Sequence, residues 1–455
     1  MSIDAQAPTL SAAARPSVRE VPLRRVMSLV RRGGPLGLLD ELGEAQGEIT
    51  RLRLGPFTPY LVTRPEHLQQ ILRTNAGNYP RGAAMWQALG RLTGDGIAGE
   101  GPQWHASREI LRGAFSGSQL AQAGEQMSDS IVAAVEEMAA RSGPDRPVDA
   151  GVEMTRVVQR VVDPVFFGRL IPEGEGDRLG EAIATAMGSL LWRMAMPFVP
   201  HAIPLPGDRA FRRATRTVHE ILRPVVAAAR SGPRDGQDVV TRLSNGVGAD
   251  GAPLTDDQVC QDIIALFVAG SESSAIGLTW IWAALAAHPQ VAERVRAEVD
   301  QVIGSGRPGR EHVRRLGYTQ QVLREVMRIH SVGWAVPRMA TEDDVLGGVP
   351  IPAGSTLVVS PYLTHRLAEF WPDPLRFDPG RFERDQVQRR HPLAYLPFGD
   401  GVHKCLGEAF FYQEATLIVA ALLSRYQVKV ADSVMPKLSL TLQPRDPVRL
   451  IVTPR

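Results

Sequence analysis

The sequence contains only two cysteines, Cys260 and Cys405, and they form no Cys-x-x-Cys pair. This scarcity excludes a disulfide framework and a zinc site that needs several cysteine ligands, and it favours a reducing, cytoplasmic setting. An excess of charge of one sign is also lacking, because 51 basic and 49 acidic residues leave a net charge of +2. No global field therefore favours nucleic acid or an anionic membrane as a partner.

The first thirty residues lack the apolar core of a signal peptide and contain no membrane anchor. Their basic stretch, residues 24–32, is interpreted as part of a solvated arm rather than a membrane-surface segment. The length of 455 residues and the hydrophobic content of 44% suit a soluble protein with a large core. Alternation over residues 48–54 and 57–63 predicts an early pair of strands, and long helical stretches follow. We therefore expect a mixed but helix-dominated fold.

A glycine-rich stretch, Leu396–Gly407, surrounds the second cysteine. Its three glycines suggest a backbone with positive φ or in close approach to a flat object. The apolar run Glu408–Tyr426 predicts a helix, which would place Cys405 just before an N-terminus that favours a thiolate. Such a thiolate suits axial ligation of haem iron. A nucleophilic cysteine paired with His403, and a buried cysteine in a glycine-rich turn, are the alternatives.

The pattern Phe398-Gly399-x-Gly401-x-His403-x-Cys405-x-Gly407 resembles the haem-binding signature of the cytochrome P450 family. The resemblance implies haem b with an axial thiolate from Cys405, and contacts to the haem from Phe398, Gly399, His403 and Gly407. It also implies a mainly α fold with small β-sheets, a triangular helical prism with a long central helix over the haem. With this fold we expect a flexible N-terminal arm over residues 1–30 and a single domain over 31–455.

The longest predicted helix runs from Thr255 to Ala287. Thr255 and Gln258 form a capping-box pattern, and a His-Pro pair ends the run. Its apolarity could indicate a membrane span, but a polar notch, Ser271–Ser274, lies at its centre. A charge there would cost roughly 2.5–3.5 kcal/mol in a bilayer. A helix through a protein core is therefore the better interpretation.

The notch sequence Ala269-Gly270-Ser271-Glu272-Ser273 is similar to the oxygen-activation motif of the same family, which usually ends in threonine. Small Ala269 and Gly270 would let a planar cofactor lie against the helix. Glu272 and Ser273 would be the catalytic acid and hydroxyl. The alternative is a hydrated polar kink in a core helix, which would leave a buried glutamate unpaired.

Trp104 and Arg108 are four residues apart and so share one face of a predicted helix. Taken alone, this spacing indicates only a packed tryptophan beside an exposed arginine. In the family, a Trp-x-x-x-Arg pair often meets a haem propionate. The resemblance gives the same role to Arg338 and His403.

Glu325 and Arg328 lie one turn apart on another predicted helix, a spacing that is common among exposed ion pairs. The family joins such a pair to a downstream arginine in a buried salt-bridged triad. Here that arginine is Arg381. The role implied for the triad is structural, holding the chain around the cysteine loop.

The region from Met187 to Leu205 is rich in large apolar residues and in prolines. It is either a buried helix with its exit loop or, by resemblance, a mobile lid over the substrate. Residues 332–336 would line the pocket, and the low charge of both segments favours a bulky apolar small molecule. A loose resemblance to actinobacterial members that oxidise terpenes suggests a terpenoid, sesquiterpene-like substrate in secondary metabolism. Oxidation of a macrolide, polyketide or steroid, and a rearrangement without oxygenation, stay open.

No flavin or iron–sulfur signature is visible in the chain, so electrons must come from another protein. For a soluble bacterial member, a ferredoxin and a ferredoxin reductase are the expected donors, with O2 as co-substrate and the enzyme as a monomer. Lys404, Arg112, Arg389 and Arg390 are candidate docking cations.

Overall fold

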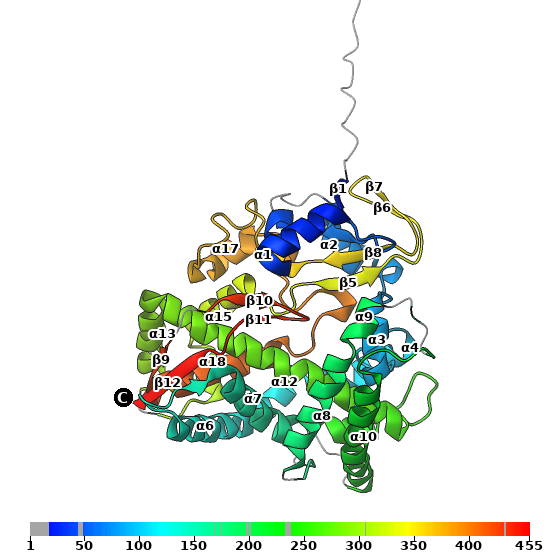
Figure 1. Ribbon diagram of the computed structural model, residues 1–455. Coiled ribbons are helices and arrows are strands. Elements are labelled where there is room, and N and C mark those ends of the chain that lie inside the picture. The colour runs from blue at the N-terminus through cyan, green and yellow to red at the C-terminus, as the bar shows by residue number, and fades with distance from the viewer. Residues whose placement is uncertain are drawn as a thin grey trace, which may run out of the picture.

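The predicted long helix is present as α12 (Asp256–Ala287) and crosses the lower, helix-rich part of the molecule (Figure 1). Thr255 caps it: its hydroxyl accepts from the Gln258 amide, and the Gln258 side chain accepts from the Thr255 amide, which confirms the capping box. Among the described residues, α12 is the one helix long and apolar enough to cross a membrane. Since 61% of its most apolar window is buried in the protein, it is a core helix.

The computed structural model describes residues 18–43, 49–168, 170–172, 174–196, 199, 202–232, 238–304, 306–431 and 434–455. It confirms a mostly helical fold with small sheets. Besides α12, the helices are α1 (Leu23–Gly43), α2 (Pro65–Gln69), α3 (Ala84–Thr93), α4 (Pro102–Ala114), α5 (Gly117–Gln122), α6 (Gly124–Arg141), α7 (Ala150–Phe166), α8 (Glu175–Ser189), α9 (Leu191–Ala195), α10 (Asp208–Ser231), α11 (Val239–Ser244), α13 (Pro289–Val302), α14 (Arg310–Val313), α15 (Gly317–Ile329), α16 (Pro361–Thr364), α17 (Arg384–Arg389) and α18 (Glu408–Arg425).

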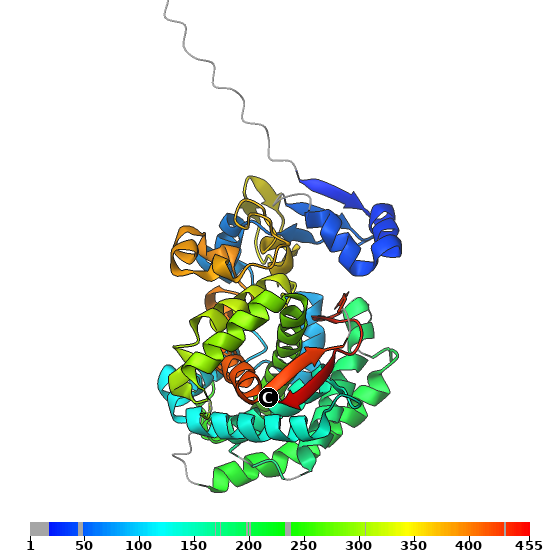
Figure 2. The ribbon, with the colours of Figure 1, turned by 90° about the vertical axis from the view of Figure 1, so that its left-hand side faces the viewer.

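The largest sheet lies in the upper part of the molecule (Figures 1 and 2) and has the strand order β1-β2-β3-β8-β5. The β1–β2 and β3–β8 pairs are parallel, whereas β2–β3 and β5–β8 are antiparallel. A three-stranded sheet, β4-β12-β9, and two hairpins, β6-β7 and β10-β11, complete the described strands. The strands are β1 (Arg19–Pro22), β2 (Thr50–Arg53), β3 (Tyr60–Val62), β4 (Val148–Asp149), β5 (Val336–Met339), β6 (Asp344–Leu346), β7 (Val349–Ile351), β8 (Thr356–Val359), β9 (Tyr426–Val430), β10 (Pro436–Leu438), β11 (Leu442–Pro444) and β12 (Arg449–Pro454).

The N-terminal segment enters the fold earlier than the sequence suggested. A flexible arm was expected to reach residue 30, but β1 pairs with β2 and α1 begins directly after it. Val26 and Leu29 of α1 are buried, and Val26 packs in a cluster with Val21 of β1 and Leu61 of β3, so this part of the arm prediction is wrong. The apolar residues of this stretch recur every three to four positions, as in a helix with one buried face, but the arginines among them obscured this pattern. Residues 1–17 lie outside the described residues.

The main hydrophobic core gathers where α7, α10 and α15 pack on α12, while α6 packs on α7 and α18 packs on α6 and α15. Trp280 and Trp282 of α12 are almost fully buried. The indole N–H of Trp280 donates to the Leu442 carbonyl at 2.9 Å, which joins β11 to the helix. The core therefore holds α12 rigidly, and with it the notch near the middle of the helix.

Candidate functional site

The cysteine loop precedes α18, and its backbone explains two of its three glycines. Gly399 and Gly401 have φ angles of 66° and 70°, the left-handed region that favours glycine. A Cβ on Gly401 would lie 1.8 Å from the Leu72 carbonyl oxygen, so no side chain fits there. Gly407 differs from the expectation, because its φ is −80° and an added Cβ would be 3.7 Å from the Cys405 sulfur, an ordinary contact.

Cys405 lies exposed in this loop, whereas Cys260 is buried in α12. The Cys405 amide donates to the Phe398 carbonyl at 2.9 Å, which closes the loop around the thiol. Desolvation by the surrounding protein raises the pKa of the thiol, and the Gly407 amide and the charges of Arg108 and Arg81 oppose this effect. Of the two cysteines, Cys405 is thus the one whose sulfur a ligand can reach.

The notch residues form a second group, on one face of α12. Ala269, Glu272 and Ser273 are spaced by three and four residues, and Ala269 and Glu272 are exposed although the helix around them is buried. A Cβ added to Gly270 would meet nothing within 4 Å, so there is open space beside the helix. The Ser273 hydroxyl donates to the Ala269 carbonyl. The face can therefore accept a flat group against bare backbone.

Glu272 is reached by solvent, but the protein around it still raises the pKa of its carboxyl by desolvation. Because Glu272 is exposed, it does not carry the free-energy cost of an unpaired buried carboxylate. That cost was the argument against a hydrated polar kink, so it does not decide between the two interpretations. The open space on the same face of the helix is what favours a bound cofactor.

Close packing connects the two groups. A Cβ added to Gly277, one turn after Ser273, would lie 3.0 Å from the ring of Phe411 in α18. The start of α18 therefore lies against the part of α12 that follows the notch. This contact brings together segments more than one hundred residues apart in the chain.

Trp104 and Arg108 of α4 reach the cysteine loop. Arg108 Nη2 donates to the Lys404 carbonyl at 2.8 Å, and its guanidinium lies 5.5 Å from the centre of the Trp104 ring. The rings of Trp104 and His403 are 4.4 Å apart. The indole N–H of Trp104 is buried and has no partner within the described part of the chain. A buried donor of this kind calls for an acceptor that a bound group would supply.

Arg81 and Glu100 belong to the same site, and the sequence did not indicate them. Arg81 is mostly buried, and its Nε has no partner among the described atoms, while Nη1 donates to the Ile97 carbonyl at 3.2 Å. Glu100 accepts from the Arg81 amide at 2.8 Å and lies 3.1 Å from Nε2 of His403. Both residues come from loops without periodicity or a recognisable motif, so only the fold reveals them.

Positive charge is in excess around this loop. Burial and, after it, the nearby charge of Arg338 lower the pKa of Arg81 to about 9. Burial also lowers the pKa of Arg338 to about 10. Desolvation would raise the pKa of Glu100, but hydrogen bonds from His403 and the Arg81 amide bring it to about 2. One carboxylate thus faces several guanidinium groups, and an anionic ligand would balance them.

These observations fit a haem. The exposed thiol, the bare face of α12, the unsatisfied indole N–H and the surplus of buried arginine charge match an iron, a flat ring and two propionates. A family model for cytochrome P450 matches residues 16–452. This chain is a cytochrome P450.

Relatives of known name support the assignment. The P450 is 29% identical over 425 residues to pentalenene oxygenase from Streptomyces avermitilis, covering 92% of this chain and 93% of the relative. It is 30% identical to cyclooctat-9-en-7-ol 5-monooxygenase from Streptomyces melanosporofaciens, covering 90% and 87%. It is also 30% identical to cyclooctatin synthase from the same organism, covering 92% of each chain. The chain is accordingly an oxidoreductase, a monooxygenase that uses haem with thiolate-ligated iron.

The fold comparison agrees. The crystal structure of the cytochrome P450DA haem domain superposes with a TM-score of 0.86 at 23% identity and covers 96% of this chain and 97% of that chain. At this level of identity the likeness establishes the fold.

The structural triad is present. Arg328 donates from Nε and Nη2 to the two oxygens of Glu325 at 2.6 and 2.8 Å, and both side chains are fully buried. Arg381 Nε lies 3.6 Å from Glu325, an ion-pair distance rather than a hydrogen bond. Glu325 also accepts from the Asp378 amide at 2.8 Å. The predicted triad is therefore confirmed, with one close pair and one looser arginine.

The lid region is partly described. Met187 lies in the last turn of α8, which ends at Ser189, and α9 begins at Leu191. After α9, residues 197, 198, 200 and 201 lie outside the described residues. Arg193, which the sequence did not single out, is buried and pairs with Asp208 at 2.6 Å. The apolar region is thus held by a buried ion pair rather than by apolar packing alone.

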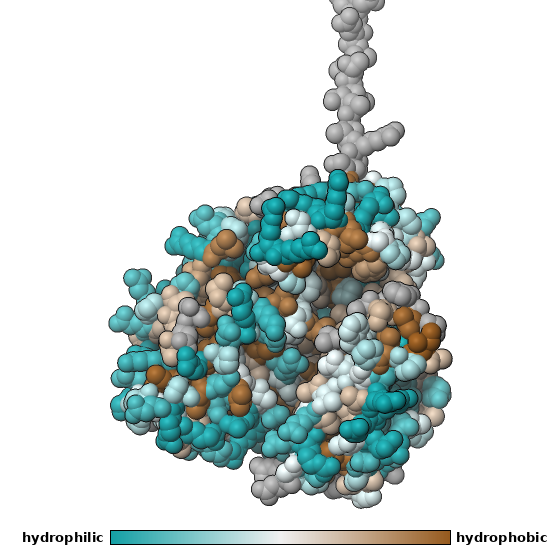
Figure 3. All heavy atoms as spheres, in the orientation of Figure 1, coloured by the Kyte–Doolittle hydropathy of each residue, from teal (hydrophilic) through white to brown (hydrophobic). Residues whose placement is uncertain are grey.

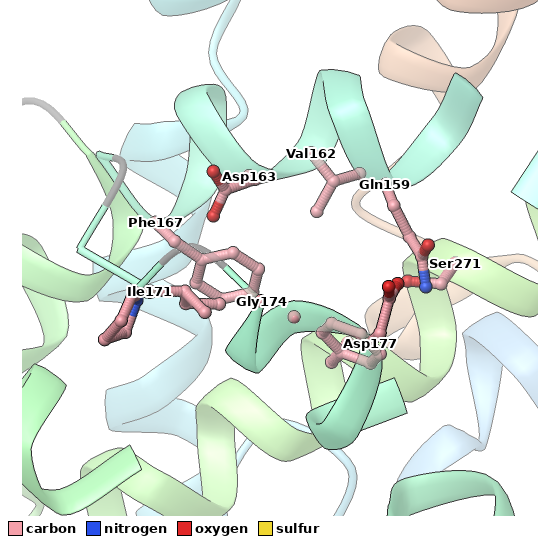
Figure 4. Close-up of a pocket in the computed structure, with 11 residues that line it drawn as sticks. Gln159, Val162, Asp163, Phe167, Ile171, Gly174, Asp177 and Ser271 are labelled. Atoms are coloured by element: carbon pink, nitrogen blue, oxygen red, sulfur yellow. The ribbon is translucent and has the colours of Figure 1, made fainter. Parts of the chain in front are cut away.

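A cavity of about 180 Å³ lies on the other side of α12, between that helix, α7 and the start of α8 (Figure 4). Figure 4 shows Gln159, Asp177 and Ser271 pointing toward one another there. Ser271 is two residues from both Ala269 and Ser273, so it lies on roughly the opposite side of the helix. This cavity contains none of the predicted site residues and is separate from the candidate haem site.

The described ranges contain no cluster of three or more His, Cys, Asp and Glu side chains that could hold a metal ion.

Proposed function

We propose that this P450 inserts one oxygen atom from O2 into a terpenoid, sesquiterpene-like substrate in secondary metabolism. The observation that carries the proposal is the similarity to pentalenene oxygenase and to the two cyclooctatin enzymes over most of the chain. The pocket candidates are compatible with it. Val332 is buried, and the indole N–H of Trp334 donates to the Ser439 carbonyl at 2.9 Å, so no polar atom of its ring needs a substrate partner.

We also propose how the chain holds its cofactor. Cys405 is assigned as the iron ligand, and Phe398, Gly399 and Gly407 shape the loop around it. When bound, the thiolate-ligated haem supplies the oxygen chemistry. Ala269 and Gly270 leave room for the ring.

The propionate side is built from donors. Trp104, Arg108, Arg338 and His403 are proposed to hold the two carboxylates, with Arg81 as a further donor through its unsatisfied Nε. Charge-assisted hydrogen bonds from arginine are stronger than neutral ones, so these contacts also offset the mutual repulsion of the guanidinium groups.

Glu272 and Ser273 are proposed to hold and move protons beside the cofactor. The Ser273 hydroxyl already donates to the Ala269 carbonyl, so its oxygen remains free to accept from a water molecule. The raised pKa of Glu272 lets the carboxyl carry a proton more readily than an ordinary glutamate. Glu272 and Ser273 are consecutive residues that both border the open face, where one water molecule can bridge their side chains.

Ferredoxin and ferredoxin reductase are proposed as the electron donors of a monomeric, cytoplasmic enzyme. The candidate docking cations need one correction. Arg390 stacks on the Trp371 ring at 3.7 Å, and burial lowers its pKa to about 10, so it is a packing residue. Lys404 and Arg112 are each paired with a nearby glutamate, whereas Arg389 is exposed.

Spectral titration of the purified haem protein tests the substrate class. Terpene hydrocarbons, macrocycles, steroids and small carboxylates are added separately, and displacement of the iron-bound water is followed. We expect a terpene to bind most tightly, because an uncharged site stabilises ligands by roughly 25 cal/mol per Å² of apolar area buried. Tighter binding of a carboxylate or a macrocycle would overturn the substrate class. Turnover without oxygen uptake would instead favour the non-oxygenating alternative.

A further inference from the structure

Asp262, in the second turn of α12, is a buried carboxylate outside the candidate haem site. Hydrophilic side chains, drawn in teal in Figure 3, cover much of the visible surface of the molecule, but Asp262 is fully buried. The Ile97 amide donates to its Oδ1 at 2.6 Å, and the Ser107 hydroxyl donates to its Oδ2 at 2.6 Å. Both donors are uncharged, and no basic side chain in the described part of the chain pairs with this carboxylate. One carboxylate thus holds two segments that are distant from α12 in the sequence.

The burial of this carboxyl group is costly. Desolvation raises the pKa of Asp262 to about 6, and the hydrogen bonds from Ser107 and Ile97 oppose this rise only in part. A buried carboxylate without a cationic partner costs free energy of folding. Hydrogen bonds to a charged acceptor are short and strong, so the carboxylate fixes its two donors more tightly than a neutral side chain would. Asp262 is therefore better explained by the segments that it holds than by stability.

The first segment is the loop of residues 94–101, between α3 and α4, which reaches a propionate donor. Ile97 donates its amide to the α12 carboxylate, while its carbonyl accepts from Arg81 Nη1 at 3.2 Å. Further along the loop, Glu100 accepts from the Arg81 amide at 2.8 Å. A single residue, Ile97, therefore links the carboxylate on α12 to the guanidinium of Arg81.

The loop lies so close to α12 that side chains are excluded where they meet. A Cβ added to Gly96 would lie 2.0 Å from Oδ1 of Asp262, and a Cβ added to Gly94 would lie 1.9 Å from the side-chain oxygen of Gln261. The φ angle of Gly96 is not positive, so the close approach to the carboxylate, rather than the backbone, requires glycine there.

The second segment is α4, which carries another propionate donor. Ser107 lies one turn after Trp104, on the same buried face of the helix. Its hydrogen bond to Asp262 therefore fixes the face that presents the Trp104 indole N–H, a buried donor without a partner among the described atoms. The two hydrogen bonds of Asp262 thus lead to two different donors.

We propose that Asp262 is a positioning residue for the haem, which sets the loop of residues 94–101 and α4 so that Arg81 and Trp104 face the propionates. Asp262 itself does not contact the cofactor and acts only through these residues. This role rests on the propionate donors proposed above.

Transfer of haem from the purified holoenzyme to excess apomyoglobin tests the role. Asp262→Leu has the same branched shape but accepts no hydrogen bond, and it should lose haem roughly tenfold faster, about the contribution of one charge-assisted hydrogen bond. Asp262→Asn should stay within about threefold of the wild type, because its amide oxygen can accept from Ile97 and its NH2 group can donate to the Ser107 oxygen. Gly96→Ala, whose Cβ presses on the carboxylate, should also lose haem faster and serves as the test if Asp262→Leu yields little holoenzyme.

A double-variant cycle separates positioning from general destabilisation. Added to the variant Arg81→Gln, Trp104→Phe, the change Asp262→Leu should accelerate haem loss by much less than the roughly tenfold factor expected in the wild-type background. A general weakening of the protein would multiply the two effects in full. Full multiplication would therefore overturn the proposal.

Glu298 on α13 offers a matched control. Its carboxylate accepts from the Tyr318 and Thr319 amides at 2.7 and 2.8 Å and from the Thr319 hydroxyl at 2.7 Å, so it joins α13 to the start of α15. Glu298→Leu should lower the Tm and leave the rate of haem loss nearly unchanged.

The outcomes distinguish the two levels of the assignment. Equal acceleration of haem loss in Asp262→Leu and Glu298→Leu would overturn the positioning role. An unchanged rate in Arg81→Gln, Trp104→Phe would refute the propionate donors and this role together. Faster loss in that variant, with unchanged rates in Asp262→Leu and Gly96→Ala, would refute the role of Asp262 alone.

Discussion

Replacing Glu325 by alanine tests how much stability the buried ion pair on α15 provides. Removal of this carboxylate leaves the guanidinium of Arg328 buried without a counter-ion. It also takes a hydrogen-bond acceptor from the Asp378 amide and a nearby negative charge from Arg381. Loss of one partner of a buried pair costs about 3–5 kcal/mol. With an unfolding entropy of about 2.1 cal/mol/K per residue, a chain of 455 residues should lose roughly 3–5 °C in Tm.

The larger consequence should be local. Arg328 donates to the carbonyls of His365 and Pro374 at 2.9 and 2.7 Å, so it organises the segment that leads to the cysteine loop. An arginine without its carboxylate holds these carbonyls less firmly. Expression of Glu325→Ala should therefore yield little haem-loaded protein, measured as the ratio of haem absorbance to protein absorbance.

The chain offers a matched control with the same spacing. Arg178 on α8 pairs with both oxygens of Glu175, at 2.7 and 2.8 Å, but its side chain is largely exposed. Glu175→Ala should cost under about 1 kcal/mol, because water screens an exposed pair, and should not change haem content. If the two variants show the same Tm and the same haem content, burial of the Glu325 pair is not the source of its effect and the reasoning is wrong.

Further predictions concern the haem site. Cys405→Ala should abolish the red-shifted carbon monoxide band of thiolate-ligated haem, whereas Cys260→Ala should keep it; the reverse result would refute the assignment. Ser273→Ala should preserve haem and substrate binding but release reducing equivalents as hydrogen peroxide, while Ser273→Thr keeps or improves the yield of product per nicotinamide oxidised. Glu272→Gln should slow turnover and leave the carbon monoxide band intact, and unchanged coupling in both variants would make the notch structural. Trp104→Phe should lose haem faster to apomyoglobin, because a donor to a propionate is removed; an unchanged rate would contradict that role.

Some of the site could be predicted from short stretches of sequence, because the responsible interactions are local. The capping box needs only Thr255 and Gln258, three residues apart. The positive φ angles of Gly399 and Gly401 follow from the tight loop before Cys405. Gly407 differs, because its φ of −80° is open to any residue, so the backbone of the loop does not by itself require glycine there.

Burial and pairing of charged groups could not be predicted in this way. Arg390 was expected to face a partner protein, but it packs on an aromatic ring, whereas its neighbour Arg389 is exposed. The two arginines are adjacent in the chain, so the sequence around them is nearly the same and does not distinguish them. Arg81 and Glu100 give no local signal either, and their role depends on loops that meet His403 some three hundred residues away.

The amino-acid sequence thus specified the thiol, the glycines beside it, the core helix with its notch and the order of these motifs, since each depends on residues within a few turns of one another. The fold specified which charges are buried, which donors lack partners and how α10, α3 and α9 come together at Asp208. These properties depend on desolvation and on contacts between distant segments, and both arise when the chain packs.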